Sequence, residues 1–233
     1  MLDKALEALN TFDWGSDPKN LKPIEEAIVA SQKDAHARAD IETKLAAVLG
    51  SKAPAAAKDY VCRQLVQIGS AACVPALAAL LNDKDLAHKA RLALERIPAS
   101  EAGAALREAL GKVEGLLKVG VISSLGGRKD EASVAAIGAL VGNSDNAVAM
   151  SAARALGTIR SAEAAKALAA AKPASPDVKQ AVTDASLACA EALLAAGKKV
   201  EALGIFKAFI GEDQPKHVRV AATRGMLAGA GKN

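Results

Sequence analysis

Three histidines are the first residues whose type could support chemistry, as metal ligands or as acid–base catalysts. They stand far apart, at His36, His88 and His217. A metal site needs several such ligands to converge, and a single histidine is by default a surface residue. We therefore assign no metal ligand to this sequence.

Two acidic pairs, Asp83 with Asp85 and Glu212 with Asp213, are the nearest approach to catalytic carboxylates. Both pairs lie just before expected helices, where capping and the helix dipole explain them. The sequence contains no phosphate-binding loop of the Walker type and no GxSxG or HExxH motif. We therefore expect no catalytic residue and no cofactor, and the chain is predicted not to be an enzyme.

The cysteines, Cys62, Cys73 and Cys189, are widely spaced and form no CxxC pair. This spacing provides no zinc or redox framework. We expect buried thiols that behave as small hydrophobic side chains. A disulfide between Cys62 and Cys73 stays open for a chain that lives outside the cytoplasm.

The composition favours packed helices. Of 233 residues 51% are hydrophobic but only 2% are aromatic, so alanine, leucine, valine and isoleucine must fill the core. The formal net charge of +4 permits an acidic partner, but no dense basic cluster accompanies it, so nucleic acid is not the expected partner. No apolar run is long enough to cross a membrane, and the amphipathic start does not read as a signal peptide. The default expectation is the cytoplasm, and the alternative is a location outside the cytoplasm for an excised mature domain.

A nine-residue pattern returns along the chain. Its last residues are Leu65, Leu94, Leu125, Leu156 and Met226, and the first four are 29, 31 and 31 residues apart. Such a period is typical of a solenoid of stacked repeats. Small aliphatic side chains also recur four places before each last residue, which predicts a helix with one buried stripe. The members of that stripe are Val61, Ala90, Val121, Ala152 and Ala222.

A break follows each of these helices, and a second helix is expected after the break. Gly69, Pro98, Gly126 and Arg160 mark the breaks, and glycine past a helix end is expected to take the left-handed cap. Ser100 and Ser161 are expected N-caps. The helices after the breaks are predicted at 71–81, 101–110, 131–141 and 162–171.

The fold prediction is all-α: a right-handed α-solenoid of about seven antiparallel helix pairs, folded as one continuous domain. Residues 1–54 are predicted to form N-terminal capping helices, at about 2–11, 19–31 and 34–49. Residues 55–172 form the regular repeats. Residues 173–233 are divergent, with a longer helix at about 177–196, a stretch similar to a tetratricopeptide hairpin, and a last pair at 199–210 and 215–228.

The repeats resemble HEAT repeats, and in particular the short HEAT-like repeats of phycobilin lyases. The resemblance is carried by Ser144–Val148 followed by Ala152–Gly157, and by Asn82–Leu86 followed by Ala90 and Leu94. It covers residues 55–172 well and 212–228 moderately. Similar alanine-rich arrays are common in bacterial proteins, so the resemblance implies a bacterial α-solenoid. It specifies a fold rather than a function, because the family includes scaffolds, inhibitors and a few enzymes.

Three enzyme classes share this architecture, and each makes a demand on the sequence. A di-iron hydroxylase needs His-Glu dipeptides, and none is present. A phycobilin lyase and an alkylpurine glycosylase both need placed aromatic residues, but the chain has one Trp, one Tyr and three Phe. Trp14 is expected in the N-terminal cap, far from the regular repeats.

A binding surface is predicted from the residues that point away from the buried stripe. Arg63, Arg154 and Arg224 each stand two places before the last residue of their nine-residue pattern. Two residues correspond to a rotation of about 200° around a helix, so these arginines point away from the buried stripe. Neighbouring side chains complete a shallow concave surface, which consists of Tyr60, Arg63, Lys89, Met150, Arg154 and Arg224. Its arginines could recognise the carboxylates of an acidic or amphipathic peptide, and the alternative is ordinary solvated arginine paired with nearby acids.

The function predicted from sequence is a non-catalytic protein–protein interaction scaffold, which could be a module of a larger protein. Its partner would be another protein or peptide, with an acidic segment as one option. A nucleic-acid-binding HEAT-like protein and a lyase-like enzyme that handles a chromophore are the alternatives.

Overall fold

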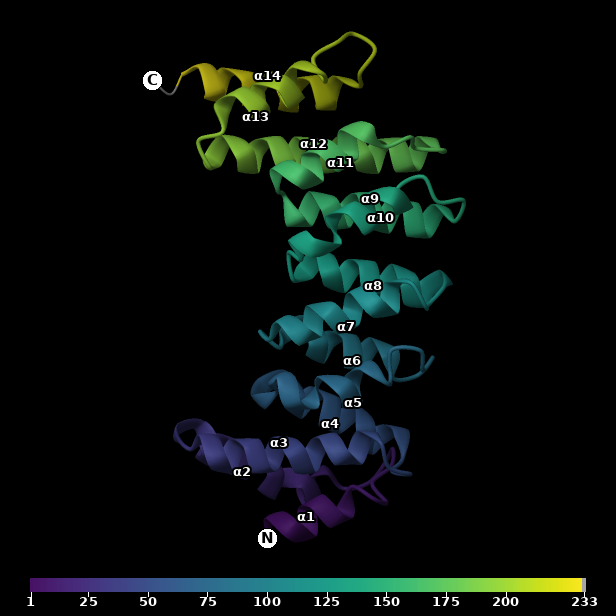
Figure 1. Ribbon diagram of the computed structural model, residues 1–233, viewed down its shortest axis with the longest axis vertical. Coiled ribbons are helices and arrows are strands. Elements are labelled where there is room, and N and C mark those ends of the chain that lie inside the picture. The colour runs from purple at the N-terminus through teal and green to yellow at the C-terminus, as the bar shows by residue number, and fades with distance from the viewer. Residues whose placement is uncertain (232–233) are drawn as a thin grey trace. The chain divides into compact units, whose positions relative to one another are not determined.

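The computed structural model describes residues 1–231 of the chain (Figure 1). Over this range the structure is all-helical, with fourteen α-helices, four short 3-10 helices and no strand. The chain forms two compact units, Met1–Val113 and the segment from Glu114 onward. The division falls inside the predicted regular region 55–172, and the single continuous domain stays a prediction.

The first unit contains seven α-helices and three 3-10 helices. They are α1 (Leu2–Ala8), η1 (Pro18–Leu21), α2 (Lys22–Ala30), η2 (Ser31–Lys33), α3 (Ala35–Leu49), α4 (Ala55–Ile68), η3 (Ala71–Cys73), α5 (Val74–Ala78), α6 (Ala87–Arg96) and α7 (Ser100–Leu110). Helix α4 packs against α3 and α6, and α5 packs against α6 and α7. Alternate helices are therefore neighbours, as expected for stacked hairpins.

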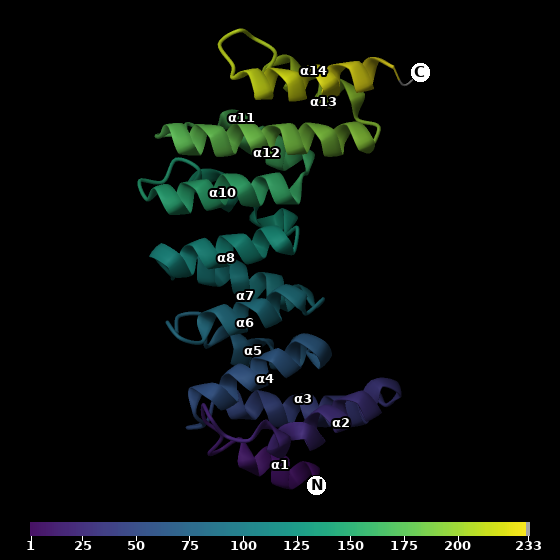
Figure 2. The same ribbon diagram turned by 180° about the vertical axis from the view of Figure 1, so that it is seen from behind.

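The described part of the second unit repeats this arrangement. Its elements are α8 (Gly115–Gly127), η4 (Glu131–Ser133), α9 (Val134–Leu140), α10 (Asn146–Ile159), α11 (Ala162–Ala170), α12 (Pro176–Ala195), α13 (Lys199–Lys207) and α14 (Lys216–Ala230). Helix α10 packs against both α8 and α12, and α9 packs against α11. Figure 2 shows α8, α10, α12 and α14 following one another in chain order.

The predicted buried stripe is the core of both units. Val61, Ala90, Val121 and Ala152 are all 0% exposed, and Ala222 of α14 is equally buried. The pattern therefore predicted the inward face of α4, α6, α8, α10 and α14 correctly. The helices between them are shorter than expected, because 71–81 and 131–141 each begin with a 3-10 turn and end early.

Acidic and hydroxyl side chains start several helices. Asp17 accepts a hydrogen bond from the backbone N–H of Lys19, and Ser161 accepts one from that of Ala164 at 3.1 Å. The cap at Ser161 was predicted. Ser100 is not a cap, because it lies inside the first turn of α7 and its hydroxyl bonds the carboxylate of Glu101.

The prediction that Gly69 and Gly126 end their helices in the left-handed conformation is wrong. Gly126 lies within α8, and Gly69 is extended, with a φ of −61°. The non-glycine residues in the left-handed conformation are Lys129, with a φ of 54°, and Arg160, with a φ of 59°. A left-handed glycine does follow α12, at Gly197 with a φ of 79°. Gly69 is needed for space, because a Cβ atom there would lie 2.8 Å from Cδ1 of Ile97.

Gly126 and Gly157 let the helices of the second unit approach closely. A Cβ atom on Gly126 would lie 3.0 Å from Cα of Ala155 in α10. A Cβ atom on Gly157 would lie 2.8 Å from Cα of Ala185 in α12. The backbones of α8 and α10, and those of α10 and α12, are therefore in close contact. This close packing brings the exposed faces of these helices side by side.

Candidate functional site

Tyr60 does not belong to an exposed surface, contrary to the sequence prediction. It lies on α4, is only 7% exposed, and donates a hydrogen bond from its hydroxyl to the backbone oxygen of Leu21 at 3.2 Å. Burial raises the pKa of this hydroxyl far above its ordinary value. The N-terminal helices cover Tyr60, and its ring lies 6.4 Å from that of Phe12. Tyr60 therefore anchors the N-terminal segment.

Arg63 and Lys89 meet at a buried carboxylate. The side chain of Asp59 on α4 is 6% exposed, and its Oδ2 lies 3.1 Å from Nη2 of Arg63. Its Oδ1 lies 3.0 Å from Nζ of Lys89 on α6. The two cations predicted to bind a partner are thus engaged by Asp59 from the partly exposed surface, and they neutralise a carboxylate that would otherwise be costly to bury. Any role of this pair in binding stays a prediction.

Trp14 lies against the regular repeats rather than far from them. It lines a pocket of about 310 Å³ together with Asp59 of α4 and Lys89 of α6, and its side chain is 72% exposed. The turn that carries Trp14 is held by Asp13, whose Oδ1 accepts from the Trp14 backbone N–H at 2.8 Å. The repeat pattern did not predict this position of Trp14, because the loop lies outside the pattern.

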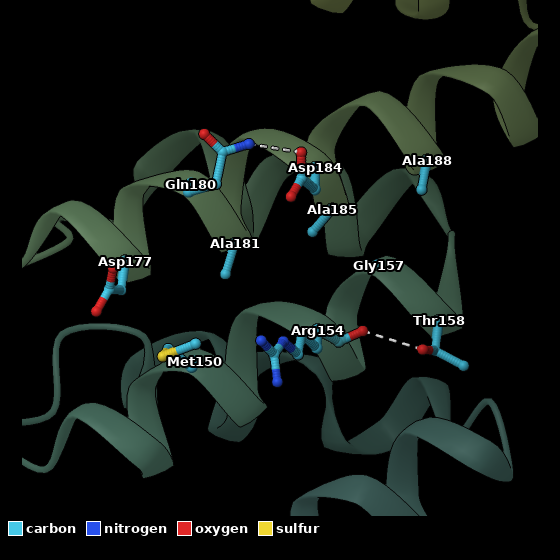
Figure 3. Close-up of a pocket in the computed structure, with 10 residues that line it drawn as sticks. All are labelled: Met150, Arg154, Gly157, Thr158, Asp177, Gln180, Ala181, Asp184, Ala185 and Ala188. Carbon is cyan, nitrogen blue, oxygen red and sulfur yellow. Dashed lines mark hydrogen bonds between the residues drawn. The ribbon is translucent and has the colours of Figure 1, made fainter. Parts of the chain in front are cut away.

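The other predicted residues lie in the second unit, where Met150 and Arg154 line a groove between α10 and α12. The groove has a volume of about 420 Å³. Its α10 wall carries Met150, Arg154, Gly157 and Thr158. Its α12 wall carries Asp177, Gln180, Ala181, Asp184, Ala185 and Ala188, as Figure 3 shows.

A second groove, of about 370 Å³, lies between α8 and α10, on the other side of the exposed α10 side chains. Val119 and Ser123 of α8 form its far wall. Met150, Arg154 and Thr158 line both grooves, so these three side chains form the ridge between them. The exposed face of α8, α10 and α12 is thus a ridge with a groove on each side, and we call it the α10 ridge surface.

Hydrogen bonds fix parts of this surface but leave its charges unpaired. Gln180 donates from Nε2 to Oδ1 of Asp184 at 2.8 Å, and Thr158 donates from its hydroxyl to the backbone oxygen of Arg154 at 3.0 Å. Within the described chain, Arg154 forms no ion pair, and neither Asp177 nor Asp184 does. The guanidinium of Arg154 is therefore available to a ligand.

Arg224 is exposed on α14 and lines neither groove. The structure thus brings Met150 and Arg154 together on one ridge, while Arg224 belongs to another helix. The α12 residues Asp177, Gln180 and Asp184 were missed by the sequence prediction. Helix α12 departs from the thirty-residue period, so no repeat place pointed to them.

The cysteines offer no reactive thiol. Cys62, Cys73 and Cys189 are free and buried, so the disulfide left open between Cys62 and Cys73 is not formed. Burial raises the pKa of Cys62 and of Cys73 to about 12 and that of Cys189 to about 11. Thiols this far from ionisation are poor nucleophiles at neutral pH.

Across residues 1–231, no three His, Cys, Asp or Glu side chains come together in a way that could hold a metal ion. Over the same range, every helix is too short or too polar to cross a bilayer.

Comparison with known proteins agrees with the architecture. Residues 104–186 match the family model of HEAT repeats, which supports a HEAT-like repeat protein. The matched segment contains α8, α9, α10 and α11 and reaches into α12. HEAT repeats are commonly protein-interaction scaffolds and are generally non-enzymatic. No curated protein matches the chain.

Proposed function

We propose that this chain is a non-catalytic protein-interaction scaffold, and that its α10 ridge surface binds a segment of another protein. Stacked hairpins hold such a surface rigid, so the scaffold loses little conformational entropy when a partner binds. The observation that carries the proposal is Arg154, which stands on the ridge between two grooves and forms no ion pair with any residue from 1 to 231.

The side chains around Arg154 support a protein partner. Arginine recognises a carboxylate through two parallel hydrogen bonds, and Met150 beside it is a flexible apolar contact. Asp177 and Asp184 across the groove would repel a phosphate backbone, which favours protein over nucleic acid. From the six predicted residues, Met150 and Arg154 therefore carry this proposal.

Site-specific photo-crosslinking in an extract of the organism that makes the protein tests the proposal. A benzoylphenylalanine probe replaces Ser123, which borders one groove. We expect a discrete adduct with another protein that is lost when Arg154→Glu is added. Lys207→Glu is the matched charge reversal, because Lys207 is exposed in the same unit and lines neither groove. An adduct that survives Arg154→Glu, or no adduct at all, would contradict the proposal.

A further inference from the structure

The groove between α10 and α12 carries charges of both signs in a fixed order. We infer that it binds an amphipathic helix of the partner, with two basic side chains seven residues apart and an acidic side chain between them. This inference rests on the proposed scaffold function and specifies its partner. The argument begins with the two carboxylates of the α12 wall.

Asp177 and Asp184 are separated by seven residues of one continuous helix. Seven residues are nearly two helical turns and a rise of about 10 Å, so both carboxylates lie on one side of α12. A second helix that runs along α12 repeats the same spacing. Lysine or arginine at places i and i+7 of that helix would therefore face both carboxylates at once.

An extended peptide does not fit this spacing. Side chains on one face of a strand recur about every 7 Å, and residues about 10 Å apart point to opposite faces. A strand that places one basic residue on Asp177 would turn its next suitable residue away from Asp184. The distance between the carboxylates therefore selects a helix as the occupant.

The opposite wall supplies the complementary charge. Figure 3 shows the side chain of Arg154 on α10, across the groove from the stretch between Ala181 and Ala185. An acidic residue at i+3 or i+4 of the bound helix shares the face that carries i and i+7. Its carboxylate would reach Arg154 while the flanking basic groups reach α12.

The floor of the groove accommodates the backbone of such a helix. Gly157, Ala181 and Ala185 present little or no side chain there, and Met150 can change its shape around a neighbour. The second groove, between α8 and α10, has no charged lining residue other than Arg154. Charge complementarity therefore favours the groove between α10 and α12.

The order of charges also excludes a uniformly acidic partner. Two carboxylates face one guanidinium in this groove, and no ion pair joins Arg154 to either of them within the described chain. A peptide with acidic residues only would form an ion pair with Arg154, but Asp177 and Asp184 would repel it. A partner with both signs in the matching order satisfies all three groups.

Synthetic helical peptides of 18 residues test this order of charges against the full chain. The matched peptide has an alanine–leucine framework with lysines seven places apart and a glutamate four places after the first lysine. A scrambled peptide of equal composition puts the lysines on opposite faces. With fluorescence anisotropy we expect the matched peptide to bind at least about tenfold more tightly than the scrambled one.

Exchanging the charges on the protein provides the decisive control. A third peptide carries glutamates in place of the lysines and lysine in place of the glutamate. The variant Asp177→Lys/Arg154→Glu/Asp184→Lys is expected to prefer this exchanged peptide, with the wild-type preference reversed. All three sites are exposed, and circular dichroism checks that the variant keeps its helices.

The outcomes separate this inference from the scaffold proposal. Equal binding of matched and scrambled peptides, no binding of either, or no reversal in the exchanged variant would overturn the helix and its charge order. The scaffold proposal survives each of these results if the crosslinked partner still depends on Arg154. The absence of any crosslink that depends on Arg154 removes both.

Discussion

Arg63 in the first unit and Arg154 in the second occupy the same place in their repeats but do different work. Each stands two places before the last residue of its nine-residue pattern, which is Leu65 in the first unit and Leu156 in the second. Four residues before Arg63 is Asp59, which pairs with it, whereas four residues before Arg154 is Met150. One residue on the same helix face therefore decides whether an arginine stabilises the fold or remains available to a ligand.

The two units also differ in how their neighbouring helices are joined. The residue directly after the nine-residue pattern is Gly126 in α8 and Gly157 in α10, but it is Val66 in α4 and Glu95 in α6. In the second unit the glycines bring the backbones of neighbouring helices together. In the first unit an ion pair between Asp59 and Lys89 links α4 to α6. Close packing and charge pairing are thus alternative ways to join neighbouring repeats.

The largest expected effect comes from removing both cations around Asp59. Arg63→Ala/Lys89→Ala leaves a buried carboxylate without a counter-charge. Because both cations are themselves partly exposed and screened by solvent, the free energy of unfolding should fall by about 2–3 kcal/mol. Urea unfolding followed by circular dichroism measures the loss. Adding Asp59→Ala should restore much of it, since no uncompensated charge then remains. A loss below about 1 kcal/mol in the double variant would mean that Asp59 is not held by these cations.

Alkaline pH should destabilise the protein, and more through the first unit than through the second. The folded-state pKa of Cys62 and Cys73 is raised from 9.0 to about 12, so folding favours the neutral thiols. Their contribution is complete below pH 9 and is lost as the pH rises toward 12, on the order of a few kcal/mol. We expect the urea midpoint to fall between pH 8.5 and 10.5.

The cysteine variants sharpen this pH comparison. Cys62→Ala/Cys73→Ala should flatten the decline more than Cys189→Ala does, because Cys189 is a single thiol with a pKa raised only to about 11. The comparison uses slopes against pH, so the constant cost of each alanine substitution cancels. Equal slopes in the two variants would show that the thiols of the first unit do not dominate.

A methyl group on Gly157 should disturb the second unit specifically. Gly157→Ala places a Cβ atom 2.8 Å from the Ala185 backbone, which cannot move away easily. We expect a loss of about 1–3 kcal/mol in urea unfolding. Gly204→Ala is the matched control, because nothing lies within 4 Å of a Cβ atom there, and it should stabilise α13 by about 0.5–1 kcal/mol. Similar effects at both sites would argue against close packing of α10 and α12.

The smallest effect on stability should come from giving the second unit the ion pair of the first. Met150→Asp places a carboxylate four residues before Arg154, as Asp59 is placed before Arg63. The helix should gain about 0.2–0.5 kcal/mol, while binding of the crosslinked partner falls about tenfold. Met150→Ala, which leaves Arg154 unpaired, should weaken binding less than Met150→Asp. The reverse order would mean that the apolar contact of Met150, and not the free guanidinium, governs binding.

The repeat pattern alone determined the helices and their buried faces. Val61, Ala90, Val121 and Ala152 were identified as core because helical periodicity is a local property, which neighbouring residues in the sequence fix. The contact between Asp59 and Arg63 is equally local, and its spacing of four could have been read from the sequence. The same period placed Arg154 on an outward face.

Only the tertiary structure decided which distant residues meet. It buried Tyr60 beneath the N-terminal helices, brought Trp14 beside Lys89, and set Asp177 and Asp184 across from Arg154. These contacts depend on how neighbouring helices rotate and how closely they pack, and the period of a stripe does not specify either. Gly126 shows the same limit, because it reads as a helix end until the backbone of Ala155 is seen to fill the space beside it.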